Sequence, residues 1–209
     1  IGTNPIDNIP PVANAGPDQA VNEDTTVTLN GSASIDNIGI TSYTWTFVDK
    51  TPKTITDVYP TYIFANPGNY TVMLNVTDLR GNWNIDTVAI IVLDKTPPIA
   101  DAGPNQTVDE SALVRFDGSR STDNVAIKNY TWTFMDGTLR TLTGENPTYV
   151  FYTPGNYTIT LNTTDAAGNW DTSTVTITVL AIPIWTRWWF WTTVALAIVA
   201  IPALPLSIR

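Results

Sequence analysis

Residues 67–78 read Pro-Gly-Asn-Tyr-Thr-Val-Met-Leu-Asn-Val-Thr-Asp, and residues 154–165 read Pro-Gly-Asn-Tyr-Thr-Ile-Thr-Leu-Asn-Thr-Thr-Asp. In the first segment, every second residue from Tyr70 to Val76 is aromatic or aliphatic, and most of the residues between them are polar. A period of two with β-branched and aromatic residues is typical of a half-buried β-strand. Each segment therefore predicts a long strand that opens after a Pro-Gly-Asn turn.

The two segments belong to an internal repeat with an offset of 87 residues, which runs without a gap from residue 10 to residue 94. The same offset pairs Gly31 with Gly118, Trp45 with Trp132, Gly68 with Gly155, and Trp83 with Trp170. A period this long fits an independently folded domain with its own core. The sequence therefore predicts an N-terminal linker or end strand (1–9), two copies of one domain (10–94 and 95–181), and a C-terminal part (182–209).

The rest of each copy is also a series of short alternating runs between Gly, Pro, Asn and Asp clusters. Residues 43–47 alternate aromatic rings with Thr, and residues 88–92 alternate aliphatic side chains with others. No convincing helical pattern precedes residue 183. About seven short strands in a copy of this length are typical of an immunoglobulin-like β-sandwich, so the fold class is all-β.

Four aromatic residues are predicted to anchor the two cores. Trp45 and Trp132 lie in the middle of a strand, where an immunoglobulin-like fold buries its tryptophan. Tyr70 and Tyr157 follow Pro-Gly-Asn, at the position of a tyrosine corner, in which the hydroxyl bonds to the backbone. Because the chain has no cysteine, these rings must hold the sheets together without a disulfide.

Composition excludes several classes of function. The 209 residues contain neither Cys nor His, and the formal net charge is −9. Thiol nucleophiles, zinc ribbons and Ser-His-Asp triads are therefore excluded. The acidic balance argues against nucleic-acid binding, which needs Lys and Arg. We expect no catalytic residues and no organic cofactor.

Four motifs recur in order in both copies: Ala-x-Ala-Gly-Pro at 13–17 and 100–104, Gly-Ser-x-Ser-x-Asp at 31–36 and 118–123, the aromatic runs 43–49 and 130–136, and the strands 67–78 and 154–165. Together they resemble the PKD (polycystic kidney disease) domain, an immunoglobulin-like family, over about four-fifths of the chain. The resemblance implies extracellular binding, adhesion or spacing without catalysis, and some domains of this family bind calcium.

One motif departs from the family pattern, in which Asp-Phe-Gly-Asp-Gly usually follows the tryptophan. Both copies keep the Phe but have Thr in place of the first Asp and an aliphatic residue or Met in place of the first Gly. The second copy keeps the final pair as Asp136-Gly137, whereas the first copy has Asp49-Lys50. The sequence therefore leaves the turn of the first copy open.

The C-terminal part has the composition of a membrane anchor. Residues 188–206 contain no charged residue, and a helix of that length spans about 28 Å, close to the hydrocarbon thickness of a bilayer. We therefore expect one C-terminal transmembrane α-helix that contacts lipid. The residues expected at the membrane interface are Trp185, Arg187, Trp188, Trp189 and Trp191.

Seven Asn-x-Ser/Thr sequons favour an extracellular location for the sandwiches, with a cytoplasmic C-terminus. Asn75 and Asn162 alternate with inward-facing Leu residues, so they should face solvent. The alternative interpretation is an unmodified polar strand surface. The glycosylation candidates are Asn30, Asn69, Asn75, Asn105, Asn129, Asn156 and Asn162.

Aspartates and one Asn are predicted to gather at one end of each sandwich, where the second–third and sixth–seventh strand loops meet. Oxygen ligands of this kind suit Ca²⁺, although Asp side chains at such positions also cap turns through backbone N–H groups. The calcium candidates are Asn14, Asp36 and Asp78 in the first copy, and Asp101, Asp123 and Asp165 in the second.

Trp83 and Trp170 follow Gly-Asn in a loop. The favoured interpretation is that each ring covers the open end of the core, and the alternative is that it stacks on a saccharide.

The leading functional prediction is a membrane-anchored cell-surface protein that acts as a structural, adhesive or spacer element through protein or carbohydrate contacts. A second hypothesis is an accessory single-span subunit of a larger membrane complex, whose sandwiches cover the outer face of that complex. A third is a non-catalytic binding module of a secreted hydrolase.

Overall fold

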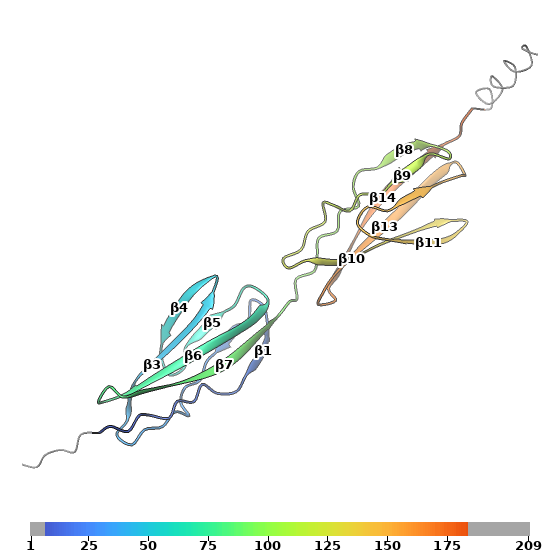
Figure 1. The fold of residues 1–209 in the computed structure, drawn as a ribbon. Helices are drawn as coiled ribbons and strands as arrows, with labels where there is room; N and C mark the ends of the chain where they lie inside the picture. The colour runs from blue at the N-terminus through green and yellow to red at the C-terminus, as the bar shows by residue number, and fades with distance from the viewer. Residues whose placement is uncertain (1–6, 184–209) are drawn as a thin grey trace, which may run out of the picture. The chain divides into compact units, whose positions relative to one another are not determined.

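The computed structural model describes residues 7–183, which divide into two compact units at Thr96 and Pro97. Figure 1 shows each unit as a set of β-strands without a helix in the described part. The strands of the first domain are β1 (Gln19–Asn22), β2 (Thr26–Thr28), β3 (Ile40–Asp49), β4 (Thr51–Thr56), β5 (Thr61–Ile63), β6 (Gly68–Asp78) and β7 (Trp83–Leu93). Those of the second domain are β8 (Gln106–Asp109), β9 (Leu113–Arg115), β10 (Ile127–Asp136), β11 (Thr138–Thr143), β12 (Thr148–Val150), β13 (Gly155–Asp165) and β14 (Trp170–Leu180).

Each domain contains one large sheet and one small sheet. The large sheet of the first domain has the order β1-β7-β6-β3-β4, and β2 pairs with β5 in the small sheet. β1 runs parallel to β7, whereas the other neighbours are antiparallel. The second domain repeats this arrangement as β8-β14-β13-β10-β11 and β9-β12. The prediction of an all-β chain with two β-sandwich domains is thus confirmed.

The cores follow the alternation of the long strands. On β6, Val72, Leu74 and Val76 are fully buried, while the residues between them point to the outer face. The rings of Trp45 and Trp132 are completely buried. Each tryptophan also satisfies its indole N–H, which donates over 3.0 Å to the carbonyl of Asp57 in the first domain and of Gly144 in the second.

The tyrosines at the start of β6 and β13 form the hydrogen bond of a tyrosine corner. The Tyr70 hydroxyl donates to the carbonyl oxygen of Asn66 at 2.8 Å, and the Tyr157 hydroxyl donates to that of Thr153 at 2.7 Å. The Tyr70 ring lies 4.4 Å from the ring of Phe64, centroid to centroid. These contacts join the long strand to the small sheet without a covalent bond.

The turn that the sequence left open has the same backbone form in both domains. Lys50 has φ +56° and Gly137 has φ +66°, so both residues adopt the left-handed conformation. The flanking pairs are also equivalent, Asp49 with Thr51 and Asp136 with Thr138. Glycine adopts this conformation without a steric penalty, whereas a side chain does not. The first domain therefore forms the same turn although Lys50 disfavours the left-handed conformation.

The predicted C-terminal helix and its interface residues, Trp185, Arg187, Trp188, Trp189 and Trp191, lie outside the described residues. Within residues 7–183, no helix is long and apolar enough to cross a bilayer.

Candidate functional site

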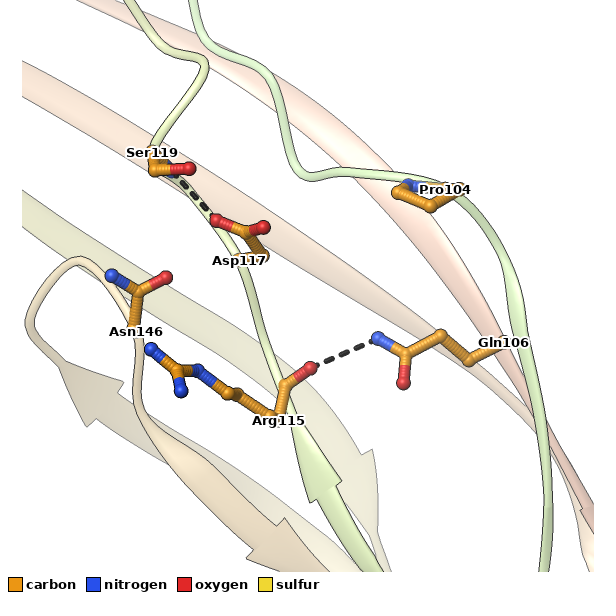
Figure 2. A pocket seen from close by; sticks show the side chains of 6 residues that line it. All are labelled: Pro104, Gln106, Arg115, Asp117, Ser119 and Asn146. Carbon is orange, nitrogen blue, oxygen red and sulfur yellow. Dashed lines mark hydrogen bonds between the residues drawn. The ribbon is translucent and has the colours of Figure 1, made fainter.

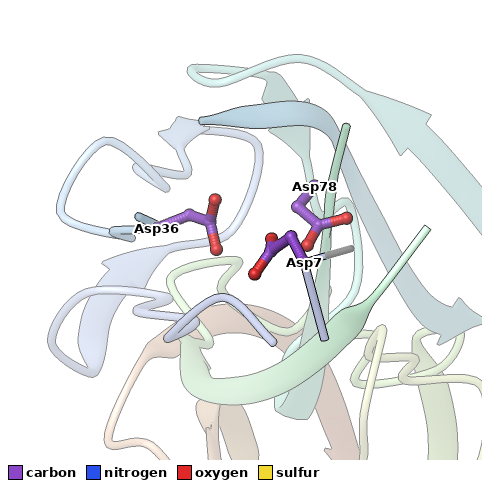
Figure 3. A group of neighbouring side chains, drawn as sticks. All are labelled: Asp7, Asp36 and Asp78. Atoms are coloured by element: carbon purple, nitrogen blue, oxygen red, sulfur yellow. The ribbon is translucent and has the colours of Figure 1, made fainter. Parts of the chain in front are cut away.

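Three carboxylates come together at one end of the first sandwich (Figure 3). Asp78 is the last residue of β6, Asp36 lies in the loop between β2 and β3, and Asp7 precedes the first strand. One carboxylate oxygen of each residue lies within 4.8 Å of the corresponding oxygens of the other two. Residues far apart in the sequence thus provide a compact set of oxygen ligands.

Asp78 is the most deeply placed of the three, with a relative exposure of 2%. Its Oδ1 accepts the backbone N–H groups of Arg80 (2.7 Å) and Asn82 (2.9 Å), and its Oδ2 accepts the Asn82 side-chain amide at 2.7 Å. Burial alone raises the pKa of Asp78, but these hydrogen bonds outweigh that effect, and the pKa lies below its usual value. The carboxylate is therefore charged at neutral pH.

Asp36 and Asp7 each use one oxygen for a turn, and the other oxygen has no partner within residues 7–183. Oδ2 of Asp36 accepts the N–H groups of Ile38 and Gly39, both at 2.8 Å. Oδ1 of Asp7 accepts the N–H of Ile9 and the side-chain amide of Asn37, both at 3.1 Å. Oδ1 of Asp36 and Oδ2 of Asp7 are buried without a hydrogen bond among the described residues. Turn capping therefore accounts for only half of each carboxylate.

This arrangement fits a divalent cation with oxygen ligands. Three clustered carboxylates repel one another, and a buried oxygen without a partner costs free energy. Ca²⁺ binds oxygen at about 2.3–2.6 Å, so two oxygens on one ion lie at most about 5 Å apart. The 4.8 Å limit on the three ligand atoms meets that condition. Aspartate side chains supply only oxygen ligands, and such ligands favour Ca²⁺ over Zn²⁺.

The second domain builds the equivalent loops in the same way. Oδ1 of Asp165 accepts the N–H groups of Gly168 (2.6 Å) and Asn169 (2.8 Å), and Oδ2 accepts the Asn169 side chain. Burial raises the pKa of Asp165, but the hydrogen bonds outweigh it and the net pKa is lowered. Asp123 caps Val125 through Oδ2, and its Oδ1 is buried without a partner in the described part of the chain.

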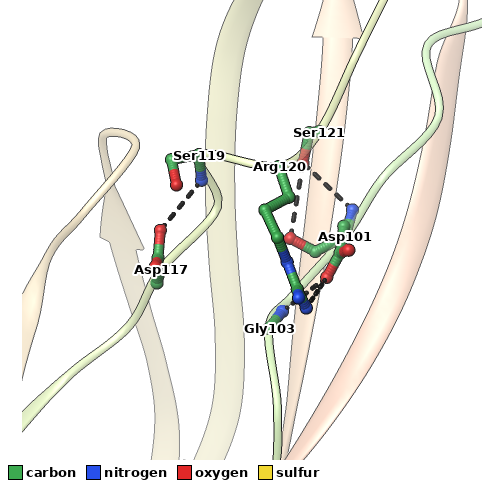
Figure 4. Close-up of polar contacts among 6 residues, drawn as sticks. All are labelled: Asp101, Gly103, Asp117, Ser119, Arg120 and Ser121. Atoms are coloured by element: carbon green, nitrogen blue, oxygen red, sulfur yellow. Dashed lines mark hydrogen bonds and ion pairs between the residues drawn. The ribbon is translucent and has the colours of Figure 1, made fainter.

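Asn14 and Asp101, which the sequence predicted as calcium ligands, are engaged in turns. Oδ1 of Asn14 accepts the N–H of Gly16 at 2.9 Å, and Oδ1 of Asp101 accepts the N–H of Gly103 at 2.8 Å. Figure 4 shows that Asp101 Oδ1 also pairs with the Arg120 guanidinium, at 3.0 Å. These oxygens thus already have protein partners.

Asp7 is the ligand candidate that sequence reasoning missed, because residues 1–9 were interpreted as a linker. The signal that identifies it is the repeat itself. The 87-residue offset pairs Asp7 with Asp94, so an Asp precedes both copies at the same position.

The second domain also carries a polar groove of ≈ 480 Å³ (Figure 2), near the exposed ion pair of Arg120. The groove is lined by Pro104, Gln106, Arg115, Asp117, Ser119 and Asn146. The side-chain amide of Gln106 donates to the Arg115 carbonyl at 3.0 Å, and Asp117 caps Ser119 at 3.0 Å. The groove therefore offers hydrogen-bonding groups but no aromatic ring on which a sugar could stack.

The tryptophans at the start of β7 and β14 do not cover the cores. Trp83 is 60% exposed and Trp170 is 62% exposed, so the favoured prediction for these rings was wrong. Their positions follow from the alternation along each strand, which places Trp83 on the same outer face as Ile85 and Ile91. An exposed ring in each domain is left available for contacts with a partner.

The sequon asparagines are all at least partly accessible. Asn75 and Asn162 are half-buried on the outer face of β6 and β13, and their Oδ1 atoms accept the hydroxyls of Thr77 and Thr164. The other five are exposed: Asn30, Asn69, Asn105, Asn129 and Asn156.

The family described as PKD domain matches this chain twice, at residues 8–92 and at residues 95–179. The chain belongs to the PKD domain family. Its two PKD domains are similar to part of the human dyslexia-associated protein KIAA0319, with 33% identity over 82% of this chain and 17% of that protein. The mouse KIAA0319-like protein is 37% identical over 59% of the chain and 13% of its own length.

The chain therefore spans less than a fifth of the length of these relatives. Among solved structures, immunoglobulin domains 1–4 of Sidekick-1 align with a TM-score of 0.45 and 15% identity. That alignment covers 85% of this chain and 49% of the other.

Proposed function

We propose that this chain is a non-catalytic cell-surface protein that acts as a spacer or as an adhesive element. Its two PKD domains would lie outside the cell, and residues 188–206 would cross the membrane. The observation that carries the proposal is the pairing of two domains, each with a continuous aromatic core, with a 19-residue uncharged segment. A sandwich with a continuous core is a stiff module, so two of them can hold a binding surface away from the bilayer. Protein or carbohydrate partners would bind the outer faces.

A protease-protection experiment on intact cells tests the location. A tag at the C-terminus should stay protected, whereas an added protease should reach both PKD domains only if they lie outside. Carbonate extraction should leave the chain in the membrane fraction. Leu196→Arg places a charge in the predicted span and should release the protein. Protected PKD domains in intact cells would contradict the proposal.

Calcium supplies a second part of this function, since it would tie the segment before the first strand to the β6–β7 loop. Asp7, Asp36 and Asp78 would hold the ion, and the two carboxylate oxygens without partners would gain one. The ion supplies the positive charge that the cluster lacks. Binding to the folded state alone stabilises it, by about 2.7 kcal/mol when calcium is at 100 times its Kd.

Calorimetry in calcium and in chelator tests this role. We expect the melting temperature of the first domain to fall in chelator by about 11–22 °C at that saturation, given about 4–8 °C per kcal/mol for a domain of this size. Asp36→Asn should abolish the difference while keeping an oxygen for the turn. Asp24→Asn is the matched control in the same domain, because Asp24 is exposed and lies outside the cluster. An identical melting curve with and without calcium would contradict a metal site.

Carbohydrate binding is a second candidate function, favoured by the exposed rings of Trp83 and Trp170. An exposed indole can stack on the apolar face of a sugar. A glycan array should then show a signal that Trp83→Ala and Trp170→Ala together remove, and a blank array would exclude this function.

A further inference from the structure

We propose that Asn69 and Asn156 carry N-linked glycans, and that the first sugar of each lies in a groove beside the modified asparagine. This inference rests on the proposed extracellular location of the domains. It goes further by naming the modified residues and the surface that receives the sugar.

Each domain has a groove at the same place on its large sheet. In the first domain the ladder between β3 and β6 ends at Thr46 and Met73, while β3 continues to pair with β4 as far as Asp49. β6 continues to pair with β7 back to Gly68. The two hairpins therefore separate beyond the last rung, and a groove of ≈ 540 Å³ opens between them.

The second domain has a groove at the same place. Its β10–β13 ladder ends at Thr133 and Thr160, and the groove beyond it measures ≈ 430 Å³. All eight residues that line it are the 87-residue equivalents of residues that line the first groove. Both volumes fall within the range of about 300–1,000 Å³ typical of small-molecule sites. The groove is thus a property of the domain rather than of one copy.

A sequon asparagine lines each groove. Asn69 and Asn156 are exposed, and each is followed two residues later by the threonine that a sequon needs, Thr71 and Thr158. The amide nitrogens of these two asparagines have no hydrogen-bond partner within residues 7–183. Of the seven sequons, only those at Asn69 and Asn156 combine an exposed asparagine with recurrence in both copies and a place on a groove.

The chemistry of the groove suits a sugar ring, which has an apolar face and a polar rim. Val48 and Met135, 64% and 61% exposed, provide the apolar contact in the two grooves. Thr46 and Thr71 in the first groove provide hydroxyls. A glycan that covered Val48 or Met135 would remove apolar surface from water without the need for a protein partner.

The modification is a transfer from a polyprenyl-phosphate-linked oligosaccharide. The amide nitrogen Nδ2 of Asn69 attacks C1 of the first sugar, and the N–C1 bond forms as the C1–O bond to phosphate breaks. The phosphate leaves with the bonding electron pair, and one proton passes from Nδ2 to a base of the transferase. An exposed side chain at the start of β6 is accessible to such an enzyme in the folded domain.

Glycopeptide mass spectrometry and hydrogen exchange on the full chain, exported by a host that glycosylates sequons, test the proposal. We expect glycan on Asn69 and Asn156, and amide exchange at residues 47–52 and 134–139 about threefold slower than in enzymatically deglycosylated protein. Asn69→Gln should abolish the slowing in the first domain only. Thr71→Ser keeps the sequon and should preserve it, and Asn129→Gln, which removes an exposed sequon outside both grooves, should leave it unchanged.

Three results would overturn the proposal. One is glycan on other sequons with Asn69 and Asn156 unmodified. Another is glycan at both sites with no change in amide hydrogen exchange at the hairpin tips, which would show that the sugar does not lie in the groove. The third is no glycan at any sequon although an external protease reaches both domains. Failure of the proposed location gives a different result, because the protease then does not reach the domains in intact cells.

Discussion

β7 and β14 occupy equivalent places in the two large sheets and agree at their buried positions, but their outer faces agree only in part. The inward residues are aliphatic in both strands, Val88 and Ile90 in the first domain and Val175 and Ile177 in the second. On the outer faces, Trp83, Thr87 and Leu93 have identical equivalents, but the other three positions differ. β7 presents Ile85, Ala89 and Ile91, whereas β14 presents Thr172, Thr176 and Thr178 at the same positions.

This difference shows which positions folding constrains and which positions can vary on the surface. Inward positions must fill the space around a buried tryptophan, so the two copies hold similar side chains there. Outward positions contact solvent or a partner, and the first domain exposes an apolar strip in which Ile85 is 46% and Ile91 is 42% exposed. Residues on the outer faces can therefore differ between the two domains without a cost to folding.

The largest expected effect tests whether the two cores are energetically equivalent. Trp45→Ala and Trp132→Ala should each cost about 3–5 kcal/mol, since each leaves a large cavity. The loss should be greater in the second domain, where Trp132 stacks on Phe116 at 5.3 Å, than in the first, where Leu29 takes that place. Denaturant unfolding with hydrogen exchange in peptides of each domain measures both.

Phe116→Leu provides the control for that difference, because it gives the second core the side chain of the first. If Trp132→Ala costs the same in the wild-type chain and in the Phe116→Leu variant, the stacking contributes nothing.

One buried position breaks the agreement between the cores. Val76 and Thr163 are equivalent and both fully buried, but the hydroxyl of Thr163 has no hydrogen-bond partner among the described residues. A buried hydroxyl without a partner costs about 1–3 kcal/mol. Thr163→Val should therefore stabilise the second domain by about 1–2 kcal/mol, and Val76→Thr should destabilise the first by a similar amount. An unchanged midpoint in Thr163→Val would mean that water reaches this hydroxyl.

The sequence predicts these cores well because their cause is local. Alternation with a period of two predicts which side chains of a strand point inward, and the repeat gives this pattern twice. The positions of Trp45 and Tyr70 could therefore be predicted from the sequence alone. The loops are different. Asp36 uses one oxygen in a turn and leaves the other in a cluster, and that division depends on where Asp7 lies in space, which no periodicity encodes.

The prediction for the exposed tryptophans was wrong for a related reason. Trp83 follows Gly-Asn, which marks the end of a loop, but whether the ring points inward depends on the register between β6 and β7. Thr77 pairs with Trp83 on the outer face. A shift of one residue would have buried the ring.

Acid should destabilise both domains through the buried aspartates at the ends of β6 and β13. The pKa of Asp78 and of Asp165 is lowered in the folded state, where hydrogen bonds outweigh the effect of burial. A lowered pKa gives stability that is complete above the unfolded pKa, near about 4, and is lost as the pH falls through the folded value. We therefore expect the urea midpoint of each domain to fall below about pH 4 in chelator.

Asp78→Asn tests this assignment, because it should weaken the pH dependence of the urea midpoint in the first domain alone. Asp165→Asn should do the same in the second domain alone. Midpoints that retain the wild-type pH dependence in both variants would assign the acid sensitivity to other carboxylates.

The smallest expected effect concerns the turn between β3 and β4, where the two domains share a backbone form but not a residue. Lys50 at φ +56° carries the steric cost of a side chain in the left-handed region, which Gly137 at φ +66° avoids. Lys50→Gly should stabilise the first domain by about 0.5–1 kcal/mol, and Gly137→Lys should destabilise the second by about 1 kcal/mol. Lys50→Ala is the control, since it removes the charge and the long side chain but keeps Cβ, and it should not stabilise. If Lys50→Gly and Lys50→Ala gave the same midpoint in denaturant unfolding, the turn would carry no backbone strain, and the Asp49-Lys50 pair would be as suited to this hairpin as Asp136-Gly137.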